Sequence, residues 1–185
     1  MVEKRFKSVL GVTGLPLSGK NAVARILKSE GYRVIDMGEV VRKEVKKRGL
    51  EPGKDSAKFV KEMREEKGMG AIAKLTVPYL EEFEGKKLLI TGMRSIDEKE
   101  VFEEELDQGI NVLAVWASEK VRRKRRERRG RREDLEGQKF HERDLREIGN
   151  GVAKLMALSD KMLVNEEVSL EELRKRVFDR AGDII

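Results

Sequence analysis

The chain has 185 residues and no cysteine, which suits one globular domain with a full core and excludes disulfide scaffolds and thiolate metal sites. The N-terminal apolar run is short and no run approaches the ~20 residues that cross a membrane, so we expect a cytoplasmic protein without a signal peptide. Charged residues of both signs make up 41% of the chain, a composition common in heat-adapted proteins, so we expect a thermophilic source.

Short apolar runs alternate with longer amphipathic runs in the first half of the chain. The sequence predicts a strand at 9–13, a helix at 21–29, a strand at 33–35 and helices at 38–48, 56–67 and 71–83. Gly31 and Gly49 follow two of these helices directly, as glycine commonly does past a helix C-terminus.

The second half continues this alternation and completes the pattern of an α/β fold. Ser95 and Ser169 each precede a Glu by three residues, which is the capping-box pattern that opens a helix. This alternation predicts a mainly parallel sheet with helices on both faces. We expect residues 1–185 to form one such domain. The predicted elements are strands at 87–91, 110–116 and 162–164, and helices after Ser95, from Ser118, at 140–158 and after Ser169. Within 140–158 a core-facing stripe is predicted by Ile148, Val152, Leu155 and Met156.

A phosphate-binding loop follows the first predicted strand. Residues 14–20 read Gly-Leu-Pro-Leu-Ser-Gly-Lys, the P-loop pattern, and lie between a strand and a helix as that motif requires. Glycines let such a loop curl around phosphates, while its N–H groups and the helix N-terminus point at the anion. We expect Lys20 to supply a cation for the β- and γ-phosphates of ATP. The residues expected to bind the nucleotide are Gly14, Leu15, Pro16, Leu17, Ser18, Gly19, Lys20 and Asn21.

The usual protein ligands for magnesium are changed at two positions. Asn21 stands where the P-loop pattern has the Ser or Thr hydroxyl that binds Mg²⁺. Thr91 ends the third predicted strand, where P-loop enzymes usually carry an acid. The two changes together predict altered use of Mg²⁺, or nucleotide binding without efficient turnover. We assign no residue of the chain as a metal ligand.

One segment carries the basic excess of the chain. Residues 120–132 hold ten Lys or Arg and one Glu, a local net charge of +9, while the remainder holds 31 basic and 34 acidic residues. An anionic partner is therefore expected to meet Lys120–Arg132. This segment is either an enlarged phosphate-binding lid or a patch for RNA or DNA, although it lacks the aromatic residues that stack on bases.

Motifs along nearly the whole chain point to one group of kinases. They are 11–20 (GVTGLPLSGK), 37–51 (MGEVVRKEVKKRGLE), the G-x-R of 92–94, Arg122 with the Arg-Gly-Arg of 129–131, the Phe-x-x-Arg-Asp of 140–144 and 163–166 (LVNE). On these residues the chain resembles the adenylate-kinase-like and dephospho-CoA-kinase-like P-loop proteins of archaea. The resemblance implies a nucleoside-monophosphate-kinase fold with a five-stranded parallel core, an acceptor-binding region near 37–83 and a lid near 120–143. It does not specify the acceptor.

The resemblance also implies roles for individual arginines. Arg42 and Arg94 match the arginines that bind the phosphate of the acceptor in these kinases. Arg122, Arg131 and Arg143 match positions along the lid that neutralise the migrating phosphoryl group. Guanidinium suits this work because it stays charged and binds phosphate oxygens in pairs.

Asp36 has two interpretations that the sequence leaves open. Dephospho-CoA kinases carry a catalytic acid near this point, so the resemblance implies that Asp36 orients the acceptor hydroxyl. Its place before the helix at 38–48 instead predicts a helix cap, which is the interpretation we prefer. His141, the only histidine, is expected at the surface rather than as a base.

The residues together predict a kinase-like enzyme. It would bind ATP at the P-loop and pass the γ-phosphoryl group to a small phosphorylated acceptor such as a nucleoside monophosphate or dephospho-CoA. Lys20, Arg94, the lid arginines and Asp36 form the candidate catalytic set, and ATP is the co-substrate. The alternative is a non-catalytic nucleotide-binding or RNA-associated protein derived from such kinases.

Overall fold

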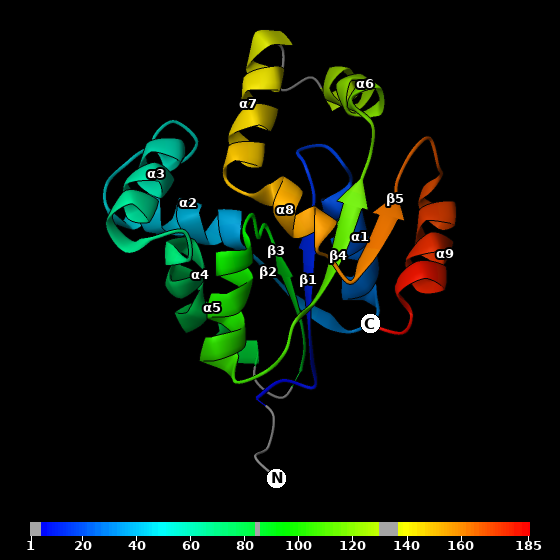
Figure 1. Cartoon of the computed structure of the whole chain (residues 1–185), viewed down its shortest axis with the longest axis horizontal. Coiled ribbons are helices and arrows are strands. Elements are labelled where there is room, and N and C mark those ends of the chain that lie inside the picture. The colour runs from blue at the N-terminus through cyan, green and yellow to red at the C-terminus, as the bar shows by residue number, and fades with distance from the viewer. Residues whose placement is uncertain (1–4, 84–85, 130–136) are drawn as a thin grey trace.

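Five strands form one parallel sheet, as the alternation of elements predicts. The computed structural model describes residues 5–83, 86–129 and 137–185. Its strands are β1 (Ser8–Thr13), β2 (Tyr32–Asp36), β3 (Lys87–Thr91), β4 (Asn111–Trp116) and β5 (Lys161–Val164). They lie in the order β2-β3-β1-β4-β5 with every neighbouring pair parallel (Figure 1). The central β1 therefore delivers the P-loop to the carboxyl edge of the sheet, at the point where the strand order reverses.

Helices cover both faces of the sheet, and two more lie beyond its carboxyl edge (Figure 1). One face carries α1 (Lys20–Ser29) and α9 (Leu170–Ala181). The other carries α2 (Met37–Lys47), α3 (Ser56–Lys67), α4 (Ala71–Thr76), the 3₁₀ turn η1 (Val77–Phe83), α5 (Ile96–Leu106) and α8 (Val152–Ala157). Beyond the edge lie α6 (Glu119–Arg129) and α7 (Gly137–Gly149). No helix in the described ranges is long and apolar enough to cross a membrane.

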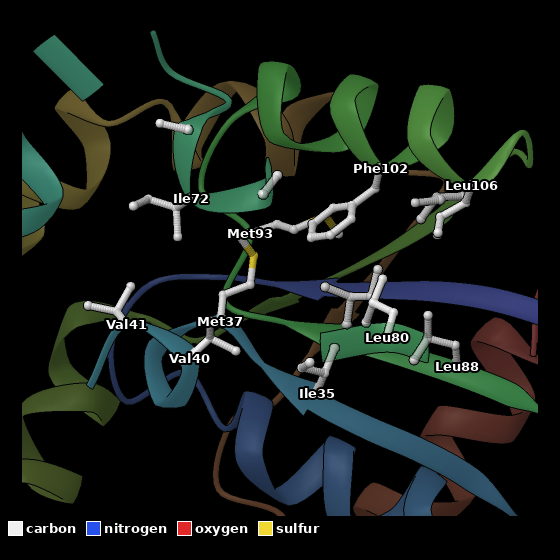
Figure 2. Packing of buried hydrophobic residues seen from close by; sticks show 14 of the residues in the cluster. Ile35, Met37, Val40, Val41, Ile72, Leu80, Leu88, Met93, Phe102 and Leu106 are labelled. Carbon is white, nitrogen blue, oxygen red and sulfur yellow. The ribbon is translucent and has the colours of Figure 1, made fainter. Parts of the chain in front are cut away.

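Alternate strand residues divide into two hydrophobic clusters, one on each face of the sheet. On β3, Leu88 and Ile90 pack toward α2–α5, while Leu89 packs toward α1 and α9. Figure 2 shows the first cluster, in which Met37 and Met93 lie with Phe102 of α5. A Cβ on Gly11 would lie 2.0 Å from Met93 Cε, so a glycine in β1 makes room for this methionine. The core thus fixes the turn after β3, which carries Arg94.

The predicted helix at 140–158 is two helices, which corrects the sequence analysis. α7 ends at Gly149, and Gly151 takes a left-handed conformation with φ 98° before α8 begins. The chain changes direction there because glycine adopts positive φ without a Cβ clash. Val152, Leu155 and Met156 are buried as predicted, but Ile148 belongs to α7 and is 44% exposed. The predicted helix at 71–83 likewise becomes 3₁₀ from Val77, where Pro78 supplies no N–H to the carbonyl of Lys74.

Candidate active site

The loop between β1 and α1 has the backbone that an anion-binding P-loop needs. Gly14 and Gly19 have φ of 144° and 105°, and Leu17 also lies at a positive φ of 64°. A Cβ on Gly14 would lie 2.3 Å from the carbonyl oxygen of Val115, and one on Gly19 would lie 1.9 Å from Asn165 Nδ2. Both glycines are therefore required by conformation and by space, as the motif predicts.

Lys20 opens α1 and folds back over the loop. Its Nζ donates to the carbonyl oxygens of Gly14 and Leu15 at 2.6 and 3.0 Å. Burial, followed by the positive charge of Arg94, lowers the pKa of the Lys20 ammonium to about 8. The carboxylate of Glu147 opposes this shift and the charge of Arg143 adds to it. Lys20 thus lies among cations at the edge of the sheet and is still mostly protonated at neutral pH.

Arg94 follows β3 and points toward α7. Its Nε donates to the Glu147 carboxylate, and its Nη1 donates to the carbonyl oxygen of Gly92 at 3.2 Å. Burial alone would lower the pKa of the Arg94 guanidinium, but the charge and hydrogen bond of Glu147 raise it above its ordinary value. Glu147 is therefore a carboxylate placed where it compensates both Arg94 and Lys20.

A buried ion pair fixes the turn that carries Arg94. Glu98 of α5 is fully buried, and its Oε2 accepts the backbone N–H of Arg94 at 2.6 Å. Its Oε1 accepts from Arg64 Nη2 of α3 at 2.8 Å. Ser95 caps α5 by accepting the Glu98 N–H at 3.2 Å, so the first half of the predicted capping box is present. The Glu98 side chain itself binds Arg94 and Arg64, which links α3 and α5 to the turn that carries Arg94.

Asp36 and Arg42 lie together at the start of α2. Asp36 Oδ1 accepts the backbone N–H of Glu39 at 3.1 Å, so the predicted helix cap is formed. A Cβ on Gly38 would lie 2.9 Å from Asp36 Oδ1 and 3.4 Å from Arg42 Nη1, which places the guanidinium above this glycine. Within the part of the chain that the structure describes, Arg42 forms a loose ion pair with Glu39 at 3.9 Å, and its side chain is 52% exposed. Arg42 is thus accessible to a bound anion.

The two positions expected to alter magnesium binding differ in exposure. Asn21 is exposed in the first turn of α1, where its amide faces solvent beside the P-loop. Thr91 is buried, and its Oγ1 donates to the Ile35 carbonyl oxygen of β2 at 3.3 Å. Among the described residues, no three His, Cys, Asp or Glu lie close enough together to bind a metal ion. Asn21, in the first turn of α1, and Asp36, at the N-cap of α2, both lie at the carboxyl edge of the sheet.

The basic segment presents its arginines on two different faces. Arg122, Arg125 and Arg126 are spaced i, i+3 and i+4 on α6 and face inward, and we call them the inner arginines. Arg122 binds Asp144 of α7 through Nη1 and Nη2 at 2.8 and 2.6 Å, and its Nη1 also donates to Pro16 O at 3.3 Å. The guanidiniums of Arg122 and Arg126 lie 5.2 and 5.3 Å from the ring centroid of Phe140. The inner arginines therefore connect α6 to α7 and to the P-loop.

The outer face of α6 and the exposed face of α7 hold further cations. Arg123 pairs with Glu119 at 2.7 Å, and Lys124 pairs with Glu167 at 3.0 Å. Arg143 is exposed on α7 and lies close enough to Lys20 to lower the pKa of its ammonium. His141 is exposed on the same helix, as expected. Arg131 lies outside the described residues.

Three residues of the site were given no role by the sequence. Asn165 follows β5, and its Nδ2 donates to Ser18 O at 2.8 Å. Glu166 accepts the backbone N–H of Ser118 at 2.7 Å and so helps position the start of α6. Asn165 and Glu166 both belong to the LVNE motif at 163–166, but only the fold brings that motif beside the P-loop. Glu147 had no motif at all.

Comparisons with known proteins agree with a P-loop architecture. A family model described as an AAA domain matches residues 13–140. A UPF0200 protein of Methanothermobacter thermautotrophicus is 42% identical over 159 residues, which cover 85% of this chain and 81% of that protein. A UPF0200 protein of Pyrobaculum aerophilum is 42% identical over 171 residues, covering 92% and 94%.

Solved structures share the fold at low identity. The structure of TT1252 from Thermus thermophilus aligns with TM-score 0.67 and 19% identity, covering 93% of this chain and 94% of that one. Shikimate kinase from Acinetobacter baumannii in complex with shikimate aligns with TM-score 0.57 and 15% identity, covering 93% and 91%. These likenesses show a P-loop kinase-like fold and leave the acceptor open.

Proposed function

The chain belongs to the UPF0200 family of P-loop kinase-like proteins, and from this premise we propose that it is an ATP-dependent phosphotransferase. ATP binds at the P-loop, and the γ-phosphoryl group passes to a small phosphorylated acceptor. The observation that carries the proposal is the position of Lys20, beside an intact P-loop and within reach of the charge of Arg94. The archaeal relatives and the 41% content of charged residues also support a heat-adapted archaeal source.

The arrangement of cations suits phosphoryl transfer. An acceptor oxygen bonds to the γ-phosphorus while the bond to the bridging β,γ-oxygen breaks and ADP leaves, so charge builds on the phosphoryl oxygens. The loop N–H groups and the Lys20 ammonium compensate that charge. Arg42, in the helix after β2, and Arg94, in the turn after β3, hold the phosphate of the acceptor from the other side. A nucleoside monophosphate or a dephospho-CoA-like molecule has the chemistry that these arginines recognise.

The remaining candidates take narrower roles in this proposal. Arg143 is the lid arginine whose charge reaches Lys20, so it contributes to compensating the transferred group. Arg122 acts by holding α6 and α7 together, because both of its Nη atoms bind Asp144. Arg131 is proposed to act with Arg143. Asp36 caps α2, and from that position it orients the acceptor.

Magnesium is proposed to bind mainly through ATP and water. Mg²⁺ commonly takes one or two protein oxygens and fills its shell with phosphate oxygens and waters. The amide oxygen of Asn21 and the carboxylate of Asp36 fit that limited demand. The ion would neutralise the β- and γ-phosphates when bound.

A second candidate function is nucleotide binding without turnover, coupled to RNA. The observation that favours it is the exposed part of the basic segment, including Lys120 and Arg128. Two exposed cations there are paired with carboxylates, and the inner arginines are taken up by the protein itself. Among the described cations of the segment, Arg122, Arg123 and Lys124 therefore already have carboxylate partners within the protein.

A Lys20→Ala variant tests the proposed nucleotide site. We expect it to lose ATP binding by more than about a hundredfold in isothermal titration calorimetry, because it loses the cation at the phosphates. Lys28→Ala is the matched control, since Lys28 is an exposed lysine in the last turn of the same helix. Near-wild-type affinity in Lys20→Ala would contradict the assignment. Transfer to candidate acceptors, followed by ³¹P NMR, separates the enzyme from the non-catalytic alternative.

A further inference from the structure

Side-chain donors bind five consecutive carbonyl oxygens of the P-loop. Lys20 binds those of Gly14 and Leu15. The donors to the next three come from α6 and from the end of β5. Arg122 Nη1 donates to Pro16 O at 3.3 Å, Arg125 Nη1 donates to Leu17 O and Ser18 O at 3.1 and 3.0 Å, and Asn165 Nδ2 donates to Ser18 O at 2.8 Å.

Arg125 and Asn165 also bind each other, so they act on the loop as one unit. Arg125 Nη2 donates to the backbone carbonyl of Asn165 at 2.9 Å. The backbone N–H of Asn165 donates to Trp116 O at 2.8 Å, which ties the unit to the end of β4. Asn165 is buried against the loop so closely that any side chain at Gly19 would strike its amide.

The hydrogen bonds to the loop carbonyls also orient the N–H groups of the loop. In a trans peptide the C=O of one residue and the N–H of the next lie in the peptide plane and point in opposite directions. Donors on the carbonyls of Pro16 and Ser18 therefore direct the N–H groups of the next residues, 17 and 19, the other way, toward the space where an anion binds. The N–H of Ser18 instead donates to Leu15 O at 3.2 Å within the loop. The donors also offset the carbonyl dipoles, whose negative ends would otherwise repel phosphate.

We propose that Arg125 and Asn165 are positioning residues that hold the P-loop in its anion-binding conformation from the carbonyl side. They touch the loop rather than the phosphates. Two cations of the basic segment, Arg122 and Arg125, therefore face the P-loop rather than an external anion. The functional part of this inference rests on the proposed nucleotide site.

Coupling between nucleotide and α6 follows from this arrangement. If the contacts of α6 with the loop stabilise the loop conformation that binds phosphate, bound phosphate must stabilise those contacts by the same factor. ATP is therefore expected to slow hydrogen exchange in α6 as well as in the loop, although α6 binds the carbonyl side.

The test compares Arg125→Met with Arg128→Met, an exposed arginine on the same helix. Methionine keeps an unbranched apolar stem and removes the three hydrogen bonds. We expect affinity for both ATP and pyrophosphate to fall about tenfold or more in Arg125→Met, the size typical of charge-assisted hydrogen bonds. Arg128→Met is expected to stay within about twofold of the wild type. Asn165→Ala removes one bond to the loop, so we expect a smaller loss, about threefold.

Pyrophosphate separates this role from direct contact with the nucleoside. If Arg125 bound the base or ribose, Arg125→Met would weaken ATP and leave pyrophosphate unchanged, and that result would overturn the proposal. A second measurement needs no ligand. Hydrogen exchange at residues 14–19 of the free protein is expected to speed up in Arg125→Met and in Asn165→Ala but not in Arg128→Met. Unchanged exchange in both would overturn the proposal.

The two proposals fail in distinguishable ways. If the wild type binds neither ATP nor pyrophosphate, the nucleotide site is wrong, while the exchange experiment still decides whether Arg125 and Asn165 hold the loop. If Arg125→Met does not fold, Asn165→Ala carries both measurements, because it leaves the Arg125–loop hydrogen bonds in place.

Discussion

The cations on the two sides of the P-loop differ in what they bind. The inner arginines bind the protein: Arg122 is 4% exposed and holds Asp144 and a loop carbonyl. On the side where we propose that the acceptor binds, Arg42 is about half exposed and Arg94 binds the side chain of Glu147. A backbone carbonyl stays in place when substrate arrives, whereas a carboxylate on a helix can be replaced by a phosphate. Arginines of one sequence can thus serve either as fixed supports or as exchangeable ligands.

The largest difference between the two sides should be in stability. Arg122→Met leaves the buried carboxylate of Asp144 without its partner, which typically costs about 3–5 kcal/mol. Arg42→Met removes an exposed, loose ion pair and should cost less than about 1 kcal/mol. Urea unfolding followed by circular dichroism measures both. Equal losses would show that the two sides do not differ as the structure indicates.

Glu147 offers a way to sharpen the comparison, because its carboxylate binds Arg94 and lies close enough to Lys20 to raise the pKa of that ammonium. Glu147→Gln removes the charge that compensates Arg94 and Lys20, so phosphate no longer competes with a carboxylate. We expect affinity for pyrophosphate to rise about tenfold, measured by calorimetry. Glu142→Gln, an exposed residue on the same helix, is the control. Unchanged or weaker binding in Glu147→Gln would mean that Glu147 does not compete with the ligand.

The pKa of Lys20 predicts opposite trends of affinity and stability with pH. Between about 8 and the ordinary 10.5, the unfolded chain holds a proton that folded Lys20 has lost. The contribution of Lys20 to stability therefore rises with pH in that window. ATP affinity falls in it, by up to about tenfold per pH unit, because the ammonium loses its charge. Calorimetric titrations from pH 7 to 9.5 test this, and NMR of labelled lysine reads the Lys20 pKa directly. A flat affinity profile would contradict the prediction.

The smallest expected effect concerns magnesium. Asn21→Ser restores the hydroxyl of the P-loop pattern at an exposed position and should strengthen the Mg²⁺ dependence of ATP binding by about twofold to fivefold. Thr91→Asp adds an acid at the end of β3, but it places a carboxylate in a buried site and loses the hydrogen bond to Ile35. The single change should therefore be measured first, by titration with and without the ion. No change would indicate that Asn21 does not limit magnesium binding.

Much of the fold could be predicted from local patterns. The apolar runs at 87–91 and 110–116 match β3 and β4 to within a residue, because strands covered on both faces are continuously apolar. Asp36, Ser95 and Ser169 cap helices as their positions predict. The break at Gly151 was missed because the apolar spacing of 140–158 fits one continuous helix. The positive φ of Gly151 does not change the spacing of the apolar residues around it, so that spacing could not reveal the break.

The sequence by itself determined the P-loop, the parallel sheet and the total charge of the basic segment, because these depend on residues close together in the chain. Only the tertiary structure decided which cations face the site and which face the protein. Asn165 lies 147 positions beyond Ser18, and Glu147 lies 53 positions beyond Arg94. The parallel strands bring such residues to one edge of the sheet, and the helical period divides a run of like charges between two faces. The order of charged residues along the chain therefore does not show which of them face the site and which face the rest of the protein.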